Sequence, residues 1–205
     1  MTSSLDSARR LLALAQTGLH FCKEEYDRER YREVAEIATG LLARESDVSA
    51  TDLLSRWQAD DGYVTPKIDV RGACFRADGR VLLVRERLDG KWTLPGGWAD
   101  VNDGPSWAVE KEIEQESGFT ARAVKLAALY DRNKHGHPHY LFHAWKVFFI
   151  CEITGGSARE SNETDGVDFF AVDALPELST GRSTATQIRR MLEHHVERTL
   201  PTDFD

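Results

Sequence analysis

The chain has 205 residues and a formal net charge of −8, with 41% hydrophobic and 29% charged residues. This balance is typical of a globular protein with enough chain for one ordinary domain and a smaller one. The acidic charge argues against a broad, sequence-independent grip on DNA, which needs lysine and arginine to neutralise phosphates. It does not exclude a diphosphate substrate, because metal ions can supply the positive charge.

Cysteine usage and the absence of leader-like segments predict a cytoplasmic protein. Cys22, Cys74 and Cys151 lie far apart and have no metal-ligand spacing, so we expect thiols in a reducing compartment. The polar start shows no signal peptide, and no apolar run is long enough to cross a membrane.

The first 60 residues predict a small all-α domain. Apolar residues recur at helical spacing over 5–19, 31–41 and 48–57, and Asp27 is placed to cap the second helix. Three helices this short have little core of their own, so we expect them to dock on the main domain or on a second copy of the chain. Residues 58–66 contain turn formers and are expected to be a linker.

From residue 67 onward the pattern changes to strands with two helices. Apolar residues alternate over 68–74, and the Asp78-Gly79 turn predicts a hairpin with a second strand over 81–84. Further strands are expected at 124–130, 140–153 and 167–172, and helices at 106–117 and 184–196. This order predicts an α+β fold, with a mixed β-sheet sandwiched by helices.

The most informative stretch joins a glycine turn to an acidic helix, from Leu94 to Phe119: LPGGWADVNDGPSWAVEKEIEQESGF. The helix places Glu112, Gln115 and Glu116 on one face, because residues three and four apart are neighbours. With a glycine carbonyl nearby, these oxygens would suit Mg²⁺ or Mn²⁺. A solvated acidic helix face is the alternative, and the glycine turn is what argues against it.

This stretch resembles the signature loop-helix of the Nudix hydrolases. The family pattern runs Gly, five residues, Glu, seven residues, Arg-Glu, an aliphatic, any residue, Glu-Glu, any residue, Gly, an aliphatic. Three positions differ: Asp103 stands for the first Glu, Lys111 for Arg, and Gln115 for a metal-ligating Glu. Asp103 and Lys111 keep the charge of the family residue, although Lys lacks the planar fork of Arg. Gln115 removes one negative charge from the metal site, so we expect weaker metal binding and slower turnover than a Glu would give.

The resemblance implies a pyrophosphohydrolase in which divalent ions sit on Glu112, Gln115, Glu116 and the Gly97 carbonyl. The ions would bridge a diphosphate and activate a water molecule for attack on phosphorus. The general base differs among these enzymes. It could be Glu112, or an acid of a later loop, for which Glu163 and Glu160 are the candidates, with ordinary loop acids as the alternative reading.

The whole chain is similar to a subgroup of Nudix hydrolases with a helical domain ahead of the catalytic one. The KIDVR, KWTLPGGWADV and LPELS runs carry this likeness. The subgroup implies a homodimer and a nucleoside diphosphate linked to a small moiety as substrate. CDP-choline, giving CMP and phosphocholine, is the first choice. ADP-ribose, giving AMP and ribose 5-phosphate, follows closely.

Residues that would bind the substrate are harder to assign. Candidates near the expected phosphate path are Arg71, Arg85, Trp98, His135 and Arg182. The arginines, with Arg87, are equally compatible with surface ion pairs, and Trp98 with packing; for Trp92 we favour the core. Lys134, His135, His137 and His139 predict a mobile lid or an exposed loop in preference to a zinc site.

Other functions remain open alternatives. Gln115 keeps a Nudix-fold ligand sensor in view, although Glu112 and Glu116 argue for an enzyme. An RNA 3′-end nuclease would need a groove wide enough for a strand. A DNA-binding regulator is not expected, because the arginines of the first helices are mixed with glutamates.

Overall fold

The computed structural model describes residues 4–44, 49–58 and 62–205. The chain divides into two compact units: Met1–Pro66 with Tyr140–His143, and Lys67–His139 with Ala144–Asp205. The expected linker over 58–66 includes residues 59–61, which lie outside the described residues. Within the described ranges, no helix is both long enough and apolar enough to cross a membrane.

The first unit is a helical module, as predicted. It contains α1 (Ser4–Phe21), α2 (Glu25–Arg44) and α3 (Ala50–Gln58). The start expected for the third helix, Val48, lies outside the described residues. A small core holds the module together, formed by Leu5, Ala8, Leu42 and Leu53.

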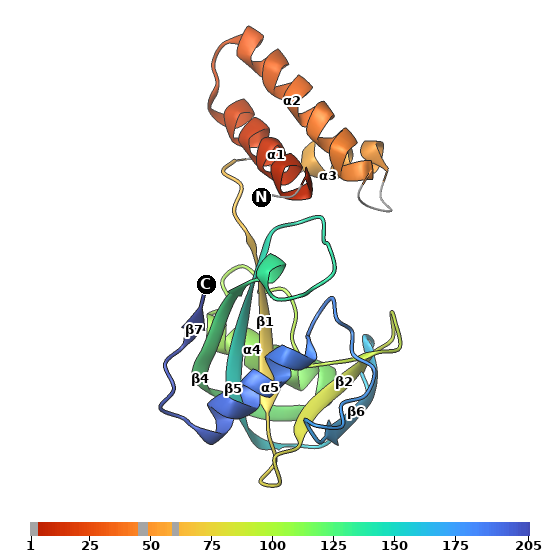
Figure 1. Ribbon diagram of the computed structural model, residues 1–205, viewed down its shortest axis with the longest axis vertical. Coiled ribbons are helices and arrows are strands. Elements are labelled where there is room, and N and C mark those ends of the chain that lie inside the picture. Colours follow the sequence, from red (N-terminus) through yellow and green to blue (C-terminus); the bar gives the residue numbers. More distant parts are fainter. Residues whose placement is uncertain (1–3, 45–48, 59–61) are drawn as a thin grey trace. The chain divides into compact units, whose positions relative to one another are not determined.

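The second unit contains two sheets that share one interior (Figure 1). The larger sheet is mixed: β1 pairs in parallel with β5, β5 is antiparallel to β4, and β4 is parallel to β7. Its strands are β1 (Lys67–Cys74), β5 (Ala144–Gly156), β4 (Phe119–Asp131) and β7 (Asp203–Phe204). The smaller sheet is antiparallel, in the order β3 (Trp92–Thr93), β2 (Val81–Glu86) and β6 (Thr164–Phe170).

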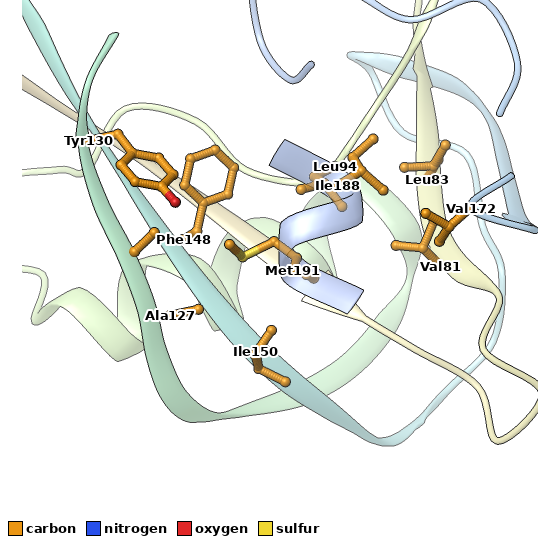
Figure 2. Packing of buried hydrophobic residues seen from close by; sticks show 12 residues of the cluster. Val81, Leu83, Leu94, Ala127, Tyr130, Phe148, Ile150, Val172, Ile188 and Met191 are labelled. Carbon is orange, nitrogen blue, oxygen red and sulfur yellow. The ribbon is translucent and has the colours of Figure 1, made fainter. Parts of the chain in front are cut away.

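Two helices cover opposite sides of this arrangement, which confirms the predicted α+β sandwich. Helix α4 (Pro105–Ser117) lies behind the strands in Figure 1 and α5 (Ala185–Val196) lies in front. Figure 2 shows Ile188 and Met191 of α5 pointing between β5 and β2. On the other side, Val109 and Ile113 of α4 are fully buried against alternate residues of the same strands.

The ends of both helices follow their sequence signals. Helix α4 stops at Gly118, which adopts φ +77 and donates its N–H to the Glu114 carbonyl. This left-handed conformation favours glycine. Helix α5 starts with a capping box, in which Thr184 and Gln187 each bond the other's backbone N–H.

Two strand predictions were wrong in part. Both strands of the expected hairpin and the turn between them are present, with Arg76 donating its N–H to the Arg80 carbonyl and Phe75 bridging to Val81. Beyond this turn β1 and β2 do not pair, because they lie in different sheets. Strand β1, which is buried from its third residue onward, pairs with β5, far along the chain. The strand expected from residue 140 begins only at Ala144, and Tyr140–His143 group with the helical unit.

Candidate functional site

A cavity of about 710 Å³ lies at one end of α4 within the second unit. It gathers residues from six segments: β1, β2, the turn after β3, helix α4, the loop before β6 and the loop before α5. The sequence-predicted residues that it brings together are Arg71, Gly97, Trp98, Glu112, Gln115, Glu116, Glu163 and Arg182. The glycine turn and the acidic helix face therefore form one site with loops that are distant in sequence.

The glycine turn runs along the free edge of β1. Gly72 donates its N–H to the Pro95 carbonyl, and Val70 donates to the Gly97 carbonyl at 2.8 Å. Gly96 adopts φ +143, and a Cβ there would collide with the Val70 carbonyl oxygen. The Gly97 carbonyl, which is expected to ligate a metal, accepts this hydrogen bond, so only its second lone pair remains for a metal.

Two glutamates of α4 project into the cavity with different surroundings. Glu116 is 5% exposed and accepts the N–H of Gly96 at 2.8 Å. Burial raises the pKa of Glu116 to about 8, and Glu86 and Glu112 add repulsion. Burial also raises the pKa of Glu112, which lies closer to solvent. The ionised form of both carboxylates is therefore unfavourable, and a bound cation would stabilise it.

The two conservative departures from the family pattern meet in one contact. Lys111 donates from Nζ to Asp100 and to Asp103, each at 2.7 Å. These hydrogen bonds raise the pKa of Lys111 above its ordinary value. One lysine thereby ties α4 to the loop that follows the glycine turn. A compact ammonium is sufficient for this, because its two partners are separate carboxylates.

The loop before β6 brings Glu163 to the cavity. Thr164 donates its hydroxyl to the Glu116 carbonyl at 2.6 Å, and Arg87 donates its backbone N–H to the Glu163 carbonyl. The side chain of Arg87 pairs with Glu160, which is absent from the cavity lining. Of the two candidate loop acids, the cavity therefore contains Glu163 alone.

Glu86 is a cavity residue that the sequence reading missed. It lies at the end of β2, where the pairing with β6 shifts register between Arg85 and Glu86. Such an irregularity changes the direction of a side chain. Glu86 is 5% exposed and pairs with Arg182 Nε at 2.9 Å. The only sequence signal was an acidic residue at the end of a strand that starts with four apolar residues. Arg159 and Asn162 also line the cavity without having been singled out.

Two predicted binding residues do not line the cavity. Arg85 pairs with Asp165 at 2.7 Å and lies over Trp92, which packs against the core cluster. Neighbouring strand residues face opposite sides, so Arg85 and Glu86 separate. His135 stacks on Tyr130 with ring centroids 3.9 Å apart and contacts Asp205.

The histidine-containing loop is not arranged as a zinc site. His137 contacts the Thr180 carbonyl through Nδ1 and Gln187 Nε2 through Nε2. Its burial lowers the pKa of His137 to about 4. Throughout residues 4–44, 49–58 and 62–205, no three side chains of His, Cys, Asp or Glu are grouped as metal ligands.

The cavity nevertheless fits a hard divalent cation through a mixed set of oxygens. A Cβ on Gly97 would lie 3.1 Å from a Glu112 carboxylate oxygen, so the turn and this carboxylate are in close contact. Glu116 and Gln115 line the same cavity. Carboxylate, amide and carbonyl oxygens are the ligands that Mg²⁺ prefers. A cation here would also relieve the repulsion among the glutamates.

Comparison with known proteins assigns both units. Residues 65–191 match the NUDIX domain, and residues 2–55 match a UDP-X-like, N-terminal oligomerisation domain. YjhB of Bacillus subtilis, a candidate ADP-ribose pyrophosphatase, is 40% identical over 100% of this chain and 98% of its own.

Two solved structures have the same fold. An ADP-ribose pyrophosphatase from Streptococcus suis is 38% identical, covering 69% of this chain and 100% of its own, with a TM-score of 0.64. A UDP-X diphosphatase is 32% identical, covering 98% of this chain and 97% of its own, also with a TM-score of 0.64. The predicted combination of a helical unit and a Nudix unit is confirmed.

Proposed function

Since this chain belongs to the Nudix family of hydrolases, we propose that it splits the diphosphate of a nucleoside diphosphate linked to a small moiety. One observation carries the proposal: a single cavity contains the glycine turn, three residues of the acidic helix face, Glu163 and three arginines. Oxygen ligands for a cation and cationic groups for phosphate thus lie together, as hydrolysis of a diphosphate requires.

Glu112, Gln115, Glu116 and the Gly97 carbonyl would hold the divalent ion, Mg²⁺ or Mn²⁺. When bound, this ion supplies positive charge for the diphosphate and lowers the pKa of a water molecule. Arg71 and Arg182 bind phosphate oxygens. Lys111 keeps the loop against α4 through Asp100 and Asp103, and so maintains the shape of the cavity.

Glu163 and Glu112 are the two candidates for the group that accepts the proton of the attacking water. Glu163 is solvent-exposed on a loop tied to α4 by Thr164, and has no metal-ligand role in this proposal. Glu112 lies against Gly97 and would share its oxygens with the cation. We favour Glu163, because a carboxylate that ligates a metal is a weaker base.

ADP-ribose is the substrate that the relatives favour, with AMP and ribose 5-phosphate as products. The Streptococcus suis structure is of an ADP-ribose pyrophosphatase, and YjhB is a candidate for the same activity. The UDP-X diphosphatase structure supports the broader class of nucleotide-linked substrates. None of these three relatives is named as a ligand sensor or an RNA nuclease.

CDP-choline remains a second candidate because of one feature of the cavity. Trp98 is 43% exposed on its lining, which also contains Asp100 and Glu163. An indole face beside carboxylates is suited to a quaternary ammonium group. A ribose phosphate would not need this combination.

We also propose that the protein acts as a homodimer through its helical unit. That unit matches an oligomerisation domain, and Leu11, Leu14 and Phe21 of α1 are 38%, 46% and 64% exposed. Their spacing places them on one side of the helix, where a second copy would bury them. Light scattering should give twice the chain mass for the wild type, and one chain mass after Leu14→Glu and Phe21→Glu.

The cytoplasm is the proposed location, in keeping with three free cysteines.

The activity is tested with a panel of ADP-ribose, CDP-choline and a UDP-linked sugar, with Mg²⁺ or Mn²⁺ present. Release of AMP, CMP or UMP is followed by chromatography, with a metal-chelated reaction as the blank. We expect metal-dependent release of a nucleoside monophosphate, fastest from ADP-ribose. Trp98→Ala should affect CDP-choline more than ADP-ribose if the indole binds choline. Absence of release from every compound would contradict the proposed function.

A further inference from the structure

A buried ion network lies beneath the cavity and includes two residues to which no role has been assigned. Asp69 on β1 pairs with Arg71 on the same strand, with Nε to Oδ1 at 2.7 Å and Nη2 to Oδ2 at 3.2 Å. Lys146, directly opposite Asp69 on β5, places Nζ 2.9 Å from Oδ2. The side chains of Asp69, Arg71 and Lys146 are 9%, 4% and 0% exposed.

The network restricts the guanidinium of Arg71 to one orientation. Besides its two bonds to Asp69, Arg71 donates from Nη1 to the Leu94 carbonyl at 3.1 Å. Three of its N–H groups are therefore held inside the protein, yet the residue still lines the cavity. A guanidinium has five N–H groups in a rigid plane, so the remaining ones are already directed before a ligand arrives.

The charges in the network do not balance. One carboxylate faces two cations. Burial acts to raise the pKa of Asp69, but the attraction and hydrogen bonds of Arg71 and Lys146 outweigh it and leave the pKa below its ordinary value. Burial lowers the pKa of Lys146 to about 8, against the attraction of Asp69. Replacing a buried ion pair by apolar residues often leaves a protein as stable or more stable, so packing alone gives no reason for such a group. Arg71 is also attracted by Glu86 and Glu116 of the cavity lining. Once a divalent cation neutralises these acids, the guanidinium would favour an anionic ligand.

Asp69 is also connected to the second wall of the cavity through its backbone. It forms an isolated antiparallel bridge with Trp98, and the adjacent Ala99 donates its N–H to the Ile68 carbonyl. The same residue thus holds Arg71 by its side chain and the start of the cavity loop by its main chain. Its side chain reaches no cavity-lining position itself.

We propose that Asp69 and Lys146 are positioning residues, which hold Arg71 in the orientation that binds one phosphate of the substrate. Asp69 sets the direction of the guanidinium, and Lys146 offsets the negative charge of Asp69 so that Arg71 keeps its attraction for phosphate. The role in catalysis rests on the proposed function. Binding of a diphosphate group to Arg71 does not, and it is measured separately.

The test uses methylenediphosphonate, a diphosphate analogue that cannot be hydrolysed at its bridge, with Mg²⁺ and the full-length protein in a calorimeter. We expect Asp69→Asn to weaken its binding about 10-fold, as loss of a charge-assisted contact would. Lys146→Met leaves the Asp69–Arg71 pair in place and should weaken binding less. With a hydrolysable substrate, Asp69→Asn should raise KM about 10-fold and change kcat by less than about threefold, because the contact is present in both ground and transition states.

Stability has to be separated from positioning, because Asp69→Asn leaves two buried cations without a carboxylate. The double variant Asp69→Asn/Lys146→Met removes the surplus ammonium and should recover much of the lost melting temperature while binding stays weak. Asp203→Asn is the matched control. Asp203 forms a similar pair of hydrogen bonds with Arg190, at 2.6 and 2.8 Å. Neither residue lines the cavity. It should lower stability and leave affinity and KM unchanged.

A double-mutant cycle shows whether Asp69 acts through Arg71. In an Arg71→Lys background, Asp69→Asn should have little further effect on methylenediphosphonate binding. Wild-type affinity in the stable Asp69→Asn/Lys146→Met variant would overturn the proposal, and so would additive losses in the cycle. A wild-type protein that binds the analogue but hydrolyses no substrate would overturn the proposed function and leave this inference standing.

Discussion

The two helices that cover the sheets, α4 and α5, pack alike but differ in how their polar and charged side chains are paired. Each presents fully buried aliphatic residues, Ile113 on α4 and Ile188 on α5, to alternate faces of the same strands. At α5 two polar contacts are closed within the protein, the Thr184–Gln187 capping box and the Arg190–Asp203 pair. At α4 the carboxylates remain crowded.

The difference shows that packing does not by itself make a site. Glu112 and Glu116 have raised pKa values because the glycine turn and the loop before β6 enclose them, and because each lies near further acids. No comparable enclosure surrounds Arg190 or Asp203, where hydrogen bonding to Arg190 holds the pKa of Asp203 below its ordinary value. Arg190 of α5 is paired with Asp203, whereas the carboxylates of α4 would be stabilised by a bound cation, beside which a phosphate could bind.

The largest expected effect is on hydrolysis, at the α4 end. Glu116→Gln should lower kcat/KM about a thousandfold, because it removes a carboxylate from the oxygen set expected to hold the metal. Metal-dependent release of nucleoside monophosphate measures it. Glu114→Gln is the control, since Glu114 is exposed on the same helix and outside the cavity lining. If the two variants were equally active, Glu116 would have no role in hydrolysis.

Truncation of the two aliphatic residues tests the comparison directly. Ile113→Ala and Ile188→Ala should each cost about 3 kcal/mol of unfolding free energy, as buried large-to-small changes do. Only Ile113→Ala should also reduce hydrolysis at a temperature where both variants are folded, because it loosens the helix that carries Glu112 and Glu116. Urea unfolding and initial rates measure the two effects. A loss of activity in Ile188→Ala of the same size would contradict the assignment of the two sides.

The raised pKa of Glu116 predicts how stability changes with pH when metal is chelated. The pKa of the folded carboxyl is about 8, whereas in the unfolded chain the carboxyl ionises near its ordinary pKa of 4.5. Between these values the folded state binds more protons, so stability should fall as pH rises, by up to about 1.4 kcal/mol per pH unit. Chemical unfolding at pH 5, 6, 7 and 8, each value about one unit from the next, measures the slope.

Two controls isolate this carboxyl. In Glu116→Gln the fall in stability should be smaller by the same amount, because the amide does not titrate. Addition of Mg²⁺ should flatten the slope in the wild type, because a bound cation stabilises the ionised carboxylate. A slope that is unchanged in Glu116→Gln would assign the pH dependence to other groups.

The smallest expected effect concerns the residue that departs most from the family pattern. Gln115→Glu adds a carboxylate to the cavity and should increase Mg²⁺ or Mn²⁺ affinity about 10-fold. Calorimetry or Mn²⁺ paramagnetic resonance measures this without substrate. Glu114→Gln again serves as the control. Unchanged affinity would mean that position 115 does not ligate the metal in this chain.

Much of helix α4 could be predicted from the sequence, because its signals are local. Helical spacing places Glu112, Gln115 and Glu116 on one side, and Gly118 ends the helix where a left-handed conformation is needed. The order of strands and helices likewise indicated an α+β fold, and the fold and the family were confirmed. The roles of the individual residues stay proposals that the experiments above address.

Other features depended on tertiary contacts and were mispredicted or missed. The Asp78-Gly79 turn suggested a hairpin, but β1 is buried on both faces and gains more from the distant β5 than from the adjacent β2. Arg85 and Glu86 are neighbours in sequence, but only Glu86 lines the cavity. Strand alternation and a register shift against β6 turn their side chains in different directions. No local pattern reveals a pairing of that kind.

By itself, the amino-acid sequence determined the glycine turn, the acidic helix face and the helical unit that precedes them, since each depends on residues a few positions apart. Only the tertiary structure decided which distant groups complete the cavity. Glu86, Glu163 and Arg182 reach it from three separate segments. The Asp69–Lys146 contact beneath it exists because β1 and β5 pair in parallel. Pairing register and loop closure are long-range choices, made by burial of the whole core, and they place charges that no short stretch of sequence can place.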